Sequence, residues 1–372
     1  MTNMDIPFVD LAGQFRNLEG ELTKAFIDVG RSGFYIMGER LESFERKAAV
    51  YCDVMHAIGV GHGSDALFLI LKALDVGPGD EVITATNSFI ASAWVVAATG
   101  ATPVLVDVGE DFNIDPACIE AAITTKTRVI IPVHLTGRPA PMNEINTLAQ
   151  FHDIHVVEDA AQAFGARYHS RRVGSIGLAA GFSLHPLKNF GVYGDGGLIT
   201  TNDEKLALKI RKLRNHGLRN RDECEMWGFN SRLDTMQAAF AEIKLGFLDG
   251  WNERCREIAE CYRTGLANYV QVPVDQTWEE CVYHNFVIRT DQRDQLMASL
   301  HDQGVDTRIH YPIPIHLQDA AKDLGYKLGD FPNAEKFANT MISLPIYPEL
   351  SDAQVAYVIS CLLYTSPSPR DS

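Results

Sequence analysis

The chain has 372 residues, of which 46% are apolar and 22% are charged. These values are ordinary for a globular protein, so they exclude a mainly disordered or collagen-like chain and leave room for one large or two unequal domains. The formal net charge of −15 disfavours binding to nucleic acid or to an anionic membrane surface, because the basic residues are not clustered. We therefore expect an enzyme that acts on a small molecule.

The cysteines and the apolar segments bear on the compartment. Seven cysteines are scattered along the chain without a CxxC pair, which predicts reduced thiols in a cytoplasmic protein. The first residues, MTNMDIPFVDL, lack the pattern of a signal peptide. The most apolar segment, 91–106, is interrupted by Gly100 and Pro103 and is shorter than the about 18–20 apolar residues of a membrane helix. We expect a cytoplasmic enzyme.

Short apolar runs alternate with segments of helical period over roughly the first 240 residues. The periodicity predicts helices at 63–74, 91–99, 116–123 and 235–245, and strands at 81–84, 102–107, 128–133 and 155–158. Residues 57–60 fit a strand and a loop equally well. This alternation predicts an α/β fold in which helices cover both faces of a mostly parallel sheet.

The pattern changes near Gly250. A charged amphipathic helix is expected at 251–269, a strand at 284–289, and segments of helical period at 294–303, 333–342 and 352–363. We therefore predict a large domain at 1–248 and a smaller α+β domain at 249–363. Residues 364–372 are polar, contain two prolines and lack periodicity, so they are expected to be a disordered, foreign-looking tail.

Two segments with possible chemistry lie at expected strand ends, where open α/β sheets bind ligands. Residues 59–65 lead directly into a helix, and this turn could hold a phosphate through Ser64 and nearby amides, or serve only for packing. The dinucleotide fingerprint fails because Ser64 stands where its third glycine belongs, and the Walker lysine is missing. Glu158 and Asp159 follow an apolar run, where an acidic residue could cap a helix or face a cofactor. Because the two residues are adjacent, at most one of them can face the site.

Two further segments could bind an anion or react with a carbonyl group. Lys188 stands among glycines after a strand-like run, where a partly desolvated amine would favour Schiff-base chemistry. Ser183 could add a phosphate contact, although a surface lysine in a flexible loop is an alternative reading. Asn230 and Arg232 suit contact with an anion, and capping with a surface salt bridge explains them nearly as well.

These features share one chemical interpretation. Pyridoxal phosphate requires a lysine for its aldehyde, an anion site for its phosphate, and a carboxylate that keeps its ring nitrogen protonated. Metal binding is not expected, because the histidines show no HxxxH or HxxEH pair.

With these residues the chain resembles the DegT/DnrJ family of sugar aminotransferases, which are fold type I enzymes that use pyridoxal phosphate. The likeness extends from SGFYIMGERLESFE (32–45) to SLPIYPEL (343–350). Its most specific stretches are GSDAL (63–67), VEDAAQAFGA (157–166), FSLHPLKNFGVYGDGG (182–197) and GFNSRLDTMQAA (228–239).

The resemblance implies roles for residues around the cofactor ring. Lys188 matches the lysine that forms the Schiff base with the cofactor and then moves protons. Asp159 matches the carboxylate at the pyridine nitrogen, with Glu158 in a supporting role. Gln162 matches the residue beside the ring hydroxyl, and Phe89 the aromatic side chain that stacks on the ring.

The resemblance also implies phosphate ligands and a partner subunit. Ser64, the amide of Asp65 and Ser183 match phosphate ligands, and Asn230 matches a residue that reaches across from a second subunit. The protein is thus expected to be a homodimer with shared active sites. Many relatives have Thr-Ala where this chain has Ser64-Asp65, so the Asp65 carboxylate should point away from the phosphate.

The implied reaction moves an amino group from glutamate to a nucleotide-linked keto sugar, for amino-sugar synthesis in a cell-surface polysaccharide or glycan. Residues expected to contact the sugar are Phe34, Tyr35, His185, His310, Tyr311 and His316. A related branch carries histidine in place of the lysine and dehydrates keto sugars, whereas Lys188 favours transamination. The alternatives are a dehydratase or decarboxylase on the same scaffold, and a non-catalytic regulator that binds the cofactor.

Overall fold

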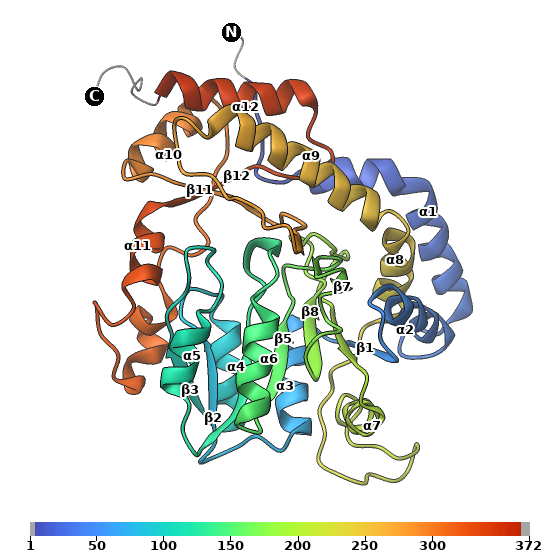
Figure 1. Ribbon diagram of the computed structural model, residues 1–372. Coiled ribbons are helices and arrows are strands. Elements are labelled where there is room, and N and C mark those ends of the chain that lie inside the picture. Colours follow the sequence, from blue (N-terminus) through green and yellow to red (C-terminus); the bar gives the residue numbers. More distant parts are fainter. Residues whose placement is uncertain (1–3, 366–372) are drawn as a thin grey trace.

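The computed structural model describes residues 4–365 (Figure 1). Residues 366–372, most of the expected tail, lie outside the described range, as do residues 1–3. The first two residues of the expected tail, 364 and 365, belong to the last helix, α12 (Asp352–Thr365), so the helix extends beyond the predicted boundary at 363.

A seven-stranded sheet in the order β1-β9-β8-β5-β4-β2-β3 forms the centre of the molecule. Its strands are β1 (His56–Val60), β2 (Glu81–Ala85), β3 (Thr102–Val106), β4 (Thr127–Ile131), β5 (His155–Asp159), β8 (Ala179–Ser183) and β9 (Gly197–Thr201). The pairs from β8 to β3 are parallel, whereas β9 runs antiparallel to both β8 and β1. The predicted α/β fold is confirmed, and the segment that fitted either a strand or a loop is strand β1.

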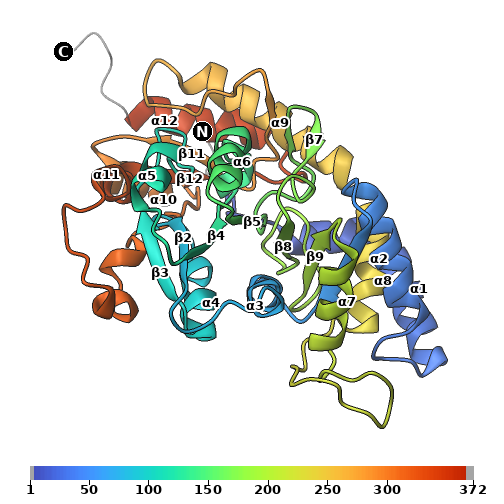
Figure 2. The same ribbon diagram turned by 60° about the horizontal axis from the view of Figure 1, so that its bottom comes forward.

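Helices cover both faces of the sheet because its strands are apolar on both sides (Figure 2). Val129 and Ile131 face one side and pack in a cluster with α3, α4 and α7, whereas Ile130 packs on the opposite side with α6. These helices, with the others beside the sheet, are α2 (Glu39–Tyr51), α3 (Gly63–Ala73), α4 (Ala91–Thr99), α5 (Pro116–Ala122), α6 (Met142–Phe151) and α7 (Glu204–Leu213). Alternation along each strand therefore divides the core into two layers.

The second part of the chain lies over one edge of this sheet, where α9 and α12 cross the top of Figure 1. Its elements are α9 (Leu248–Leu266), β11 (Phe286–Arg289), α10 (Arg293–Asp302), α11 (Pro332–Thr340) and β12 (Met341–Leu344), together with α12. The prediction of helical structure at 333–342 is wrong at its C-terminal end, because α11 ends at Thr340. The chain becomes strand β12 at Met341 because it pairs antiparallel with β11, and this pairing overrides the helical period.

The N-terminal residues pack with this second part. Ile6 is fully buried in the same cluster as Phe286 and Leu300, and its amide donates to the carbonyl of Gly304 at 2.8 Å. The boundary predicted at 248/249 stays a prediction, but packing groups Ile6 with the C-terminal side of it. Further along the chain, α1 (Leu11–Ser32) packs on α8 (Thr235–Leu245), which also contacts α2.

Short elements complete the chain. They are β6 (Arg167–Tyr168), β7 (Arg171–Arg172) and β10 (Glu279–Glu280), and the 3-10 turns η1 (Leu135–Gly137), η2 (Ile315–Leu317) and η3 (Asp319–Leu324). Among residues 4–365, none of the helices combines the length and apolar character that crossing a bilayer requires.

A buried ion pair gives a test of the packing. Glu45 of α2 accepts from the Gly59 amide of β1 at 2.8 Å and contacts the guanidinium of Arg214, which donates to the Gly59 carbonyl at 2.7 Å. Both side chains are buried. Arg214→Met removes the nearer of two guanidinium groups at the buried Glu45 carboxylate and leaves Arg211, 3.8 Å away, so we expect the free energy of unfolding to fall by about 2–4 kcal/mol.

The matched control is Arg46→Met, one residue further along α2. Arg46 pairs with Glu42 at 3.8 Å, but both side chains are largely exposed, so we expect a change below about 1 kcal/mol. Urea unfolding of the two variants measures the difference. Equal losses would show that the buried pair does not hold α2 against β1.

Candidate active site

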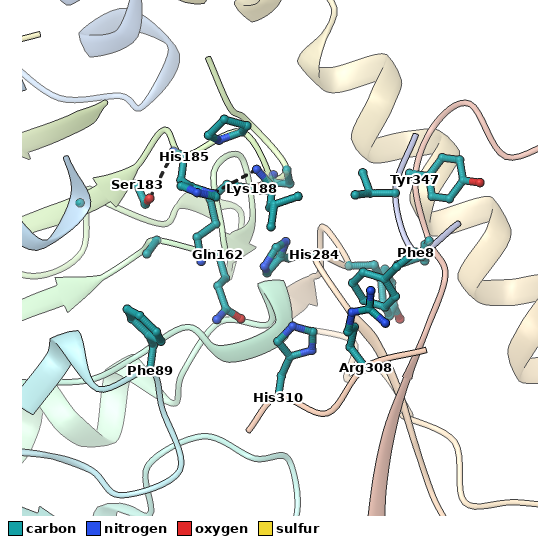
Figure 3. Close-up of a pocket in the computed structure, with 18 of the residues that line it drawn as sticks. Phe8, Phe89, Gln162, Ser183, His185, Lys188, His284, Arg308, His310 and Tyr347 are labelled. Carbon is teal, nitrogen blue, oxygen red and sulfur yellow. Dashed lines mark hydrogen bonds between the residues drawn. The ribbon is translucent and has the colours of Figure 1, made fainter. Parts of the chain in front are cut away.

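One pocket of about 520 Å³ opens between the carboxyl ends of the parallel strands and the second part of the chain (Figure 3). The volume lies in the range of small-molecule sites. The lining segments on the sheet side are residues 62–64, 89–92, 159–162 and 183–189, and those on the other side are 8–11, 251–255, 283–284, 308–311 and 346–349. The site therefore lies where an open α/β sheet is expected to bind its ligand.

Lys188 enters this pocket from the turn that follows β8. Its amide donates to the carbonyl of His185 at 2.9 Å, which closes the turn. Gly191 is required here, because a Cβ at this position would lie 2.5 Å from that carbonyl oxygen. Burial lowers the pKa of the Lys188 amine, although the charge of Asp159 acts in the opposite direction. The turn thus presents an amine that loses its proton more easily than an ordinary lysine.

Asp159 lines the same pocket from the end of β5. Its side chain is buried and accepts hydrogen bonds from the Ser92 hydroxyl at 2.8 Å and the Ala161 amide at 3.2 Å. Burial raises the pKa of the carboxyl group, and these hydrogen bonds and Lys188 offset only part of the rise. A carboxylate and an amine with shifted pKa values therefore face one cavity.

Glu158 does not line the pocket, so of the two adjacent acids Asp159 is the one that faces it. The buried Glu158 carboxylate accepts from the amides of Gly174, Ile176 and Gly177 at 2.9, 2.8 and 2.7 Å. The Nδ1 atom of His134 accepts from a backbone amide, so its Nε2–H donates to Glu158 at 3.0 Å. Burial alone would raise the pKa of Glu158, but these donors hold it below its ordinary value. Its contacts are those of a structural anchor.

Gln162 connects the two sides of the pocket. Its Oε1 atom accepts from the Thr136 amide at 2.7 Å, and its Nε2 donates to the Tyr311 hydroxyl at 3.2 Å. The rings of Tyr311 and Phe89 lie 5.7 Å apart between centroids, and both line the cavity. Two aromatic faces and one amide are therefore available to a flat ring.

The start of α3 and the end of β8 form the anion end of the pocket. Ser64 and Ser183 both line it. Gly63 lets the two segments approach, because a Cβ there would lie 2.7 Å from the Cβ of Ser183. The Asp65 carboxylate accepts from the Ser231 hydroxyl at 2.5 Å and does not line the pocket, so it points away as expected. The Asp65 amide donates to Nδ1 of His62 at 3.0 Å.

Several predicted site residues lie outside the pocket of this chain. Phe34 and Tyr35 are 72% and 55% exposed, and Asn230 is also exposed. His316 is buried, and its two ring nitrogens are hydrogen-bonded to Thr86 and Glu335 at 2.8 and 3.0 Å. His316 thus supports the segment that carries the pocket wall, and the exposed residues do not meet the cavity within one subunit.

His185 and His310 do line the pocket, and His310 has a pKa lowered to about 4 by burial, Lys188 and Arg308. Sequence reasoning missed other lining residues, among them Phe8, His284 and Arg308. His284 stands at the start of an expected strand, and no local pattern marks it or the other two. Only the docking of distant segments brings them to the site.

A separate acidic cluster does not indicate a catalytic metal. Asp275, Glu279 and Cys281 place possible ligand atoms within 4.8 Å of one another. Arg138 pairs with Glu279 at 2.8 Å and with Asp275 at 3.6 Å. Arg263 also pairs with Asp275, at 2.9 Å, so two guanidinium groups already balance the charge of these two acids.

The groups in the pocket fit pyridoxal phosphate. They include an amine with a lowered pKa, a buried carboxylate and an anion cradle at a helix N-terminus. The missing Cβ at Gly63 lets Ser183 approach this cradle. Fold and site together define the class of pyridoxal-phosphate-dependent transferases. The chain belongs to the DegT/DnrJ/EryC1/StrS aminotransferase family, whose sequence profile matches residues 16–363.

Named relatives are similar over almost the whole chain. The dTDP-3-amino-3,4,6-trideoxy-α-D-glucose transaminase of Streptomyces venezuelae is 46% identical over 96% of this chain and 95% of its own length. A pleiotropic regulatory protein of Geobacillus stearothermophilus is 45% identical over 96% of this chain and 97% of its own. The crystal structure of S. venezuelae DesV with a ketimine intermediate has a TM-score of 0.94 at 46% identity, over 96% of this chain and 97% of that one. The protein is an aminotransferase that uses pyridoxal phosphate, and the predicted family, fold and cofactor are confirmed.

The two adjacent acids allow a paired test. Glu158→Gln replaces one acceptor oxygen by a donor that faces backbone N–H groups, so we expect the unfolding free energy of the cofactor-free protein to fall by about 1–3 kcal/mol. Asp159→Asn removes a carboxylate whose pKa is raised in the fold. Such an acid costs stability as pH rises from its unfolded pKa of about 3.9 through the folded value. We therefore expect this variant to be as stable as the wild type or more stable at pH 7.

Thermal and urea unfolding of the cofactor-free proteins measure both changes. The hydroxyl of Ser92 can accept from the new amide and donate to Ser88, 2.7 Å away, so the hydrogen bond between residues 92 and 159 is kept in Asp159→Asn. Equal destabilisation by both substitutions would contradict the division between anchor and pocket residue.

Proposed function

We propose that this aminotransferase moves an amino group from glutamate to a keto sugar carried on a nucleoside diphosphate. The observation that carries the proposal is that Lys188 and Asp159 face one pocket from neighbouring strands, each with a shifted pKa. The 46% identical relative named as a dTDP-amino-sugar transaminase supports the sugar as acceptor. Its role would be amino-sugar synthesis for a polysaccharide or glycan. A cytoplasmic location is part of the proposal, and it is supported by the free thiols of Cys52, Cys118, Cys224, Cys255, Cys261 and Cys281.

The residues divide the work of the reaction. When bound, pyridoxal phosphate supplies an aldehyde that condenses with amines and a ring that accepts electrons. Lys188 Nζ takes the proton from the donor's α-carbon and delivers a proton to the acceptor carbon, a task favoured by its lowered pKa. The Asp159 carboxylate would keep the ring nitrogen of the cofactor protonated. The Ser92 hydroxyl and the Ala161 amide fix the orientation of this carboxylate.

The remaining pocket residues bind and orient. Ser64 and Ser183 would hold the phosphate at the start of α3. The Asp65 amide would join them only by giving up its hydrogen bond to Nδ1 of His62. Phe89 would cover the ring of the cofactor, and Gln162, whose amide donates to the Tyr311 hydroxyl, would contact the ring hydroxyl. These roles agree with the positions of the side chains around one cavity.

The active site is proposed to be shared between two subunits. Asn230, Phe34 and Tyr35 are exposed and lie outside the pocket of their own chain, which supports their contact with a partner's pocket. Ile36 is also exposed, so three consecutive apolar or aromatic side chains, 34–36, face outward from this chain. A homodimer would cover this surface and complete both sites.

Lys188→Ala tests the reaction. Wild-type protein with pyridoxal phosphate is expected to show a visible absorption band that glutamate bleaches, and a panel of dTDP- and UDP-linked amino sugars is expected to bleach it in the reverse direction. The variant loses the positioned amine, so transamination should slow at least about 10²-fold. Steady-state assays with glutamate and spectra of the purified protein measure both effects.

The result also separates the alternatives. Turnover of a nucleotide-linked sugar without any need for glutamate would favour a dehydratase or decarboxylase. Cofactor binding without amine transfer would favour a non-catalytic regulator. The Geobacillus relative carries the name pleiotropic regulatory protein. Unchanged transamination by Lys188→Ala would contradict the assignment of that residue.

Subunit mixing tests the shared site. Asn230→Asp would place a carboxylate against the partner's phosphate, and we expect it to be nearly inactive, as is Lys188→Ala. Co-expression of the two variants yields mixed dimers with one intact site, so about a quarter of the wild-type rate should return if assembly is random. The control is a mixture of the two proteins purified separately and not allowed to exchange subunits. No recovery in the co-expressed protein would show that Asn230 serves the site of its own chain or none.

A further inference from the structure

His284 is a pocket residue that the reaction described above does not use. Its imidazole lies between Lys188 and His310 in the view of Figure 3, and its ring centroid is 6.5 Å from that of His310. Within residues 4–365 neither ring nitrogen of His284 has a hydrogen-bond partner. Nδ1 of His310, in contrast, is bonded to the Ser343 hydroxyl at 2.9 Å, and Nδ1 of His185 accepts from a backbone amide at 3.2 Å.

The backbone around His284 is held in place. The amide of Val282 donates to the carbonyl of Gly137 at 3.0 Å, and the amide of Asn285 donates to the carbonyl of Thr136 at 3.2 Å. A Cβ at Gly137 would lie 2.8 Å from the backbone nitrogen of His284, so only glycine permits this approach of the two backbones. Because Thr136 also holds Gln162, the same turn sets both side chains at the pocket. Two ring nitrogens without a hydrogen-bond partner in residues 4–365 therefore stand on a fixed backbone at the pocket wall.

The charge state of His284 limits which ligand it suits. Burial, Lys188 and His310 keep the pKa of its imidazole well below its ordinary value, so the ring is neutral at pH 7 and offers one donor and one acceptor. A hydroxyl group can satisfy both, because it donates and accepts. A carboxylate only accepts and is bound best by cations, and Arg308 and Lys188 are the arginine and lysine side chains lining the pocket within residues 4–365.

We propose that His284 is a specificity residue that binds a hydroxyl group of the sugar during the acceptor half of the reaction. This inference rests on the proposed function, since it assigns His284 to the sugar rather than to glutamate. Amino donor and sugar share one cavity in turn, but only the sugar has hydroxyl groups near its reacting carbon. Loss of the imidazole should therefore slow the sugar half-reaction far more than the glutamate half-reaction.

Single-turnover spectroscopy of the holoenzyme separates the two halves. Glutamate bleaches the visible band through the donor half, and a nucleotide-linked amino sugar bleaches the same band through the reverse of the acceptor half. The sugar probe is dTDP-3-amino-3,4,6-trideoxy-α-D-glucose or whichever dTDP- or UDP-linked amino sugar bleaches the wild type fastest. His284→Phe keeps a planar ring without hydrogen bonds, and we expect its sugar rate to fall at least about tenfold more than its glutamate rate.

His284→Gln retains a donor and an acceptor and should recover part of the sugar rate. The control His301→Phe changes an exposed histidine of α10 that does not line the pocket, and both rates should stay at the wild-type level. Equal losses of the two rates in His284→Phe, with the visible band intact, would overturn the inference while leaving the proposed function standing. A wild-type band that glutamate bleaches and no amino sugar bleaches would overturn both.

Discussion

Burial of the Lys188 amine and the Asp159 carboxylate at one edge of the sheet holds both groups away from their ordinary protonation equilibria. The amine loses its proton more easily than in water, and the carboxyl group holds its proton more tightly. Each group favours the charged form of the other, so neither can be moved into solvent without changing both. The arrangement of the surrounding chain follows from keeping these two side chains desolvated and facing one cavity.

Hydrogen bonds of neighbouring residues hold Lys188 and Asp159 in this buried arrangement. Asp159 follows Glu158, which is anchored by His134 and three backbone amides, so the strand end cannot rotate to expose its carboxylate to water. The η1 turn connects the other side: Thr136 binds Gln162 from the sheet region and receives the segment that carries His284. A structural acid and one tight turn thus hold the pocket together, while the pocket residues remain available to ligands.

Local pattern predicted strands β2 to β5 and marked the segment around Lys188, but it left β1 undecided and did not mark β9 as a strand. Buried strands such as β4 carry apolar residues on both faces. Gly63, and Gly191 near Lys188, stand in turns where a Cβ would clash with a neighbouring segment. The choice of Asp159 over Glu158 required the resemblance to a known family. It also required the observation that only one of two adjacent side chains on a strand can face a given side.

Other features depend on contacts between distant segments, which one sequence does not display. Met341 begins a strand despite a helical period because β11 lies beside it. His284 reaches the pocket because Gly137, well over a hundred residues earlier, allows its backbone to approach. His316 shares a segment with His310 but is turned toward Thr86, a difference that residue spacing does not reveal. The docking of Ile6 in the second core is a further example.

The proposed function requires the Lys188 side chain to be the amine that holds the coenzyme. Borohydride reduction of the holoenzyme makes that linkage permanent, and peptide mapping by mass spectrometry then identifies the modified lysine. A Schiff base at Lys188 predicts a single pyridoxyl group on the peptide that contains Lys188, with the other lysines unmodified. A pyridoxyl group on a different lysine, or a cofactor that washes away after reduction, would contradict it.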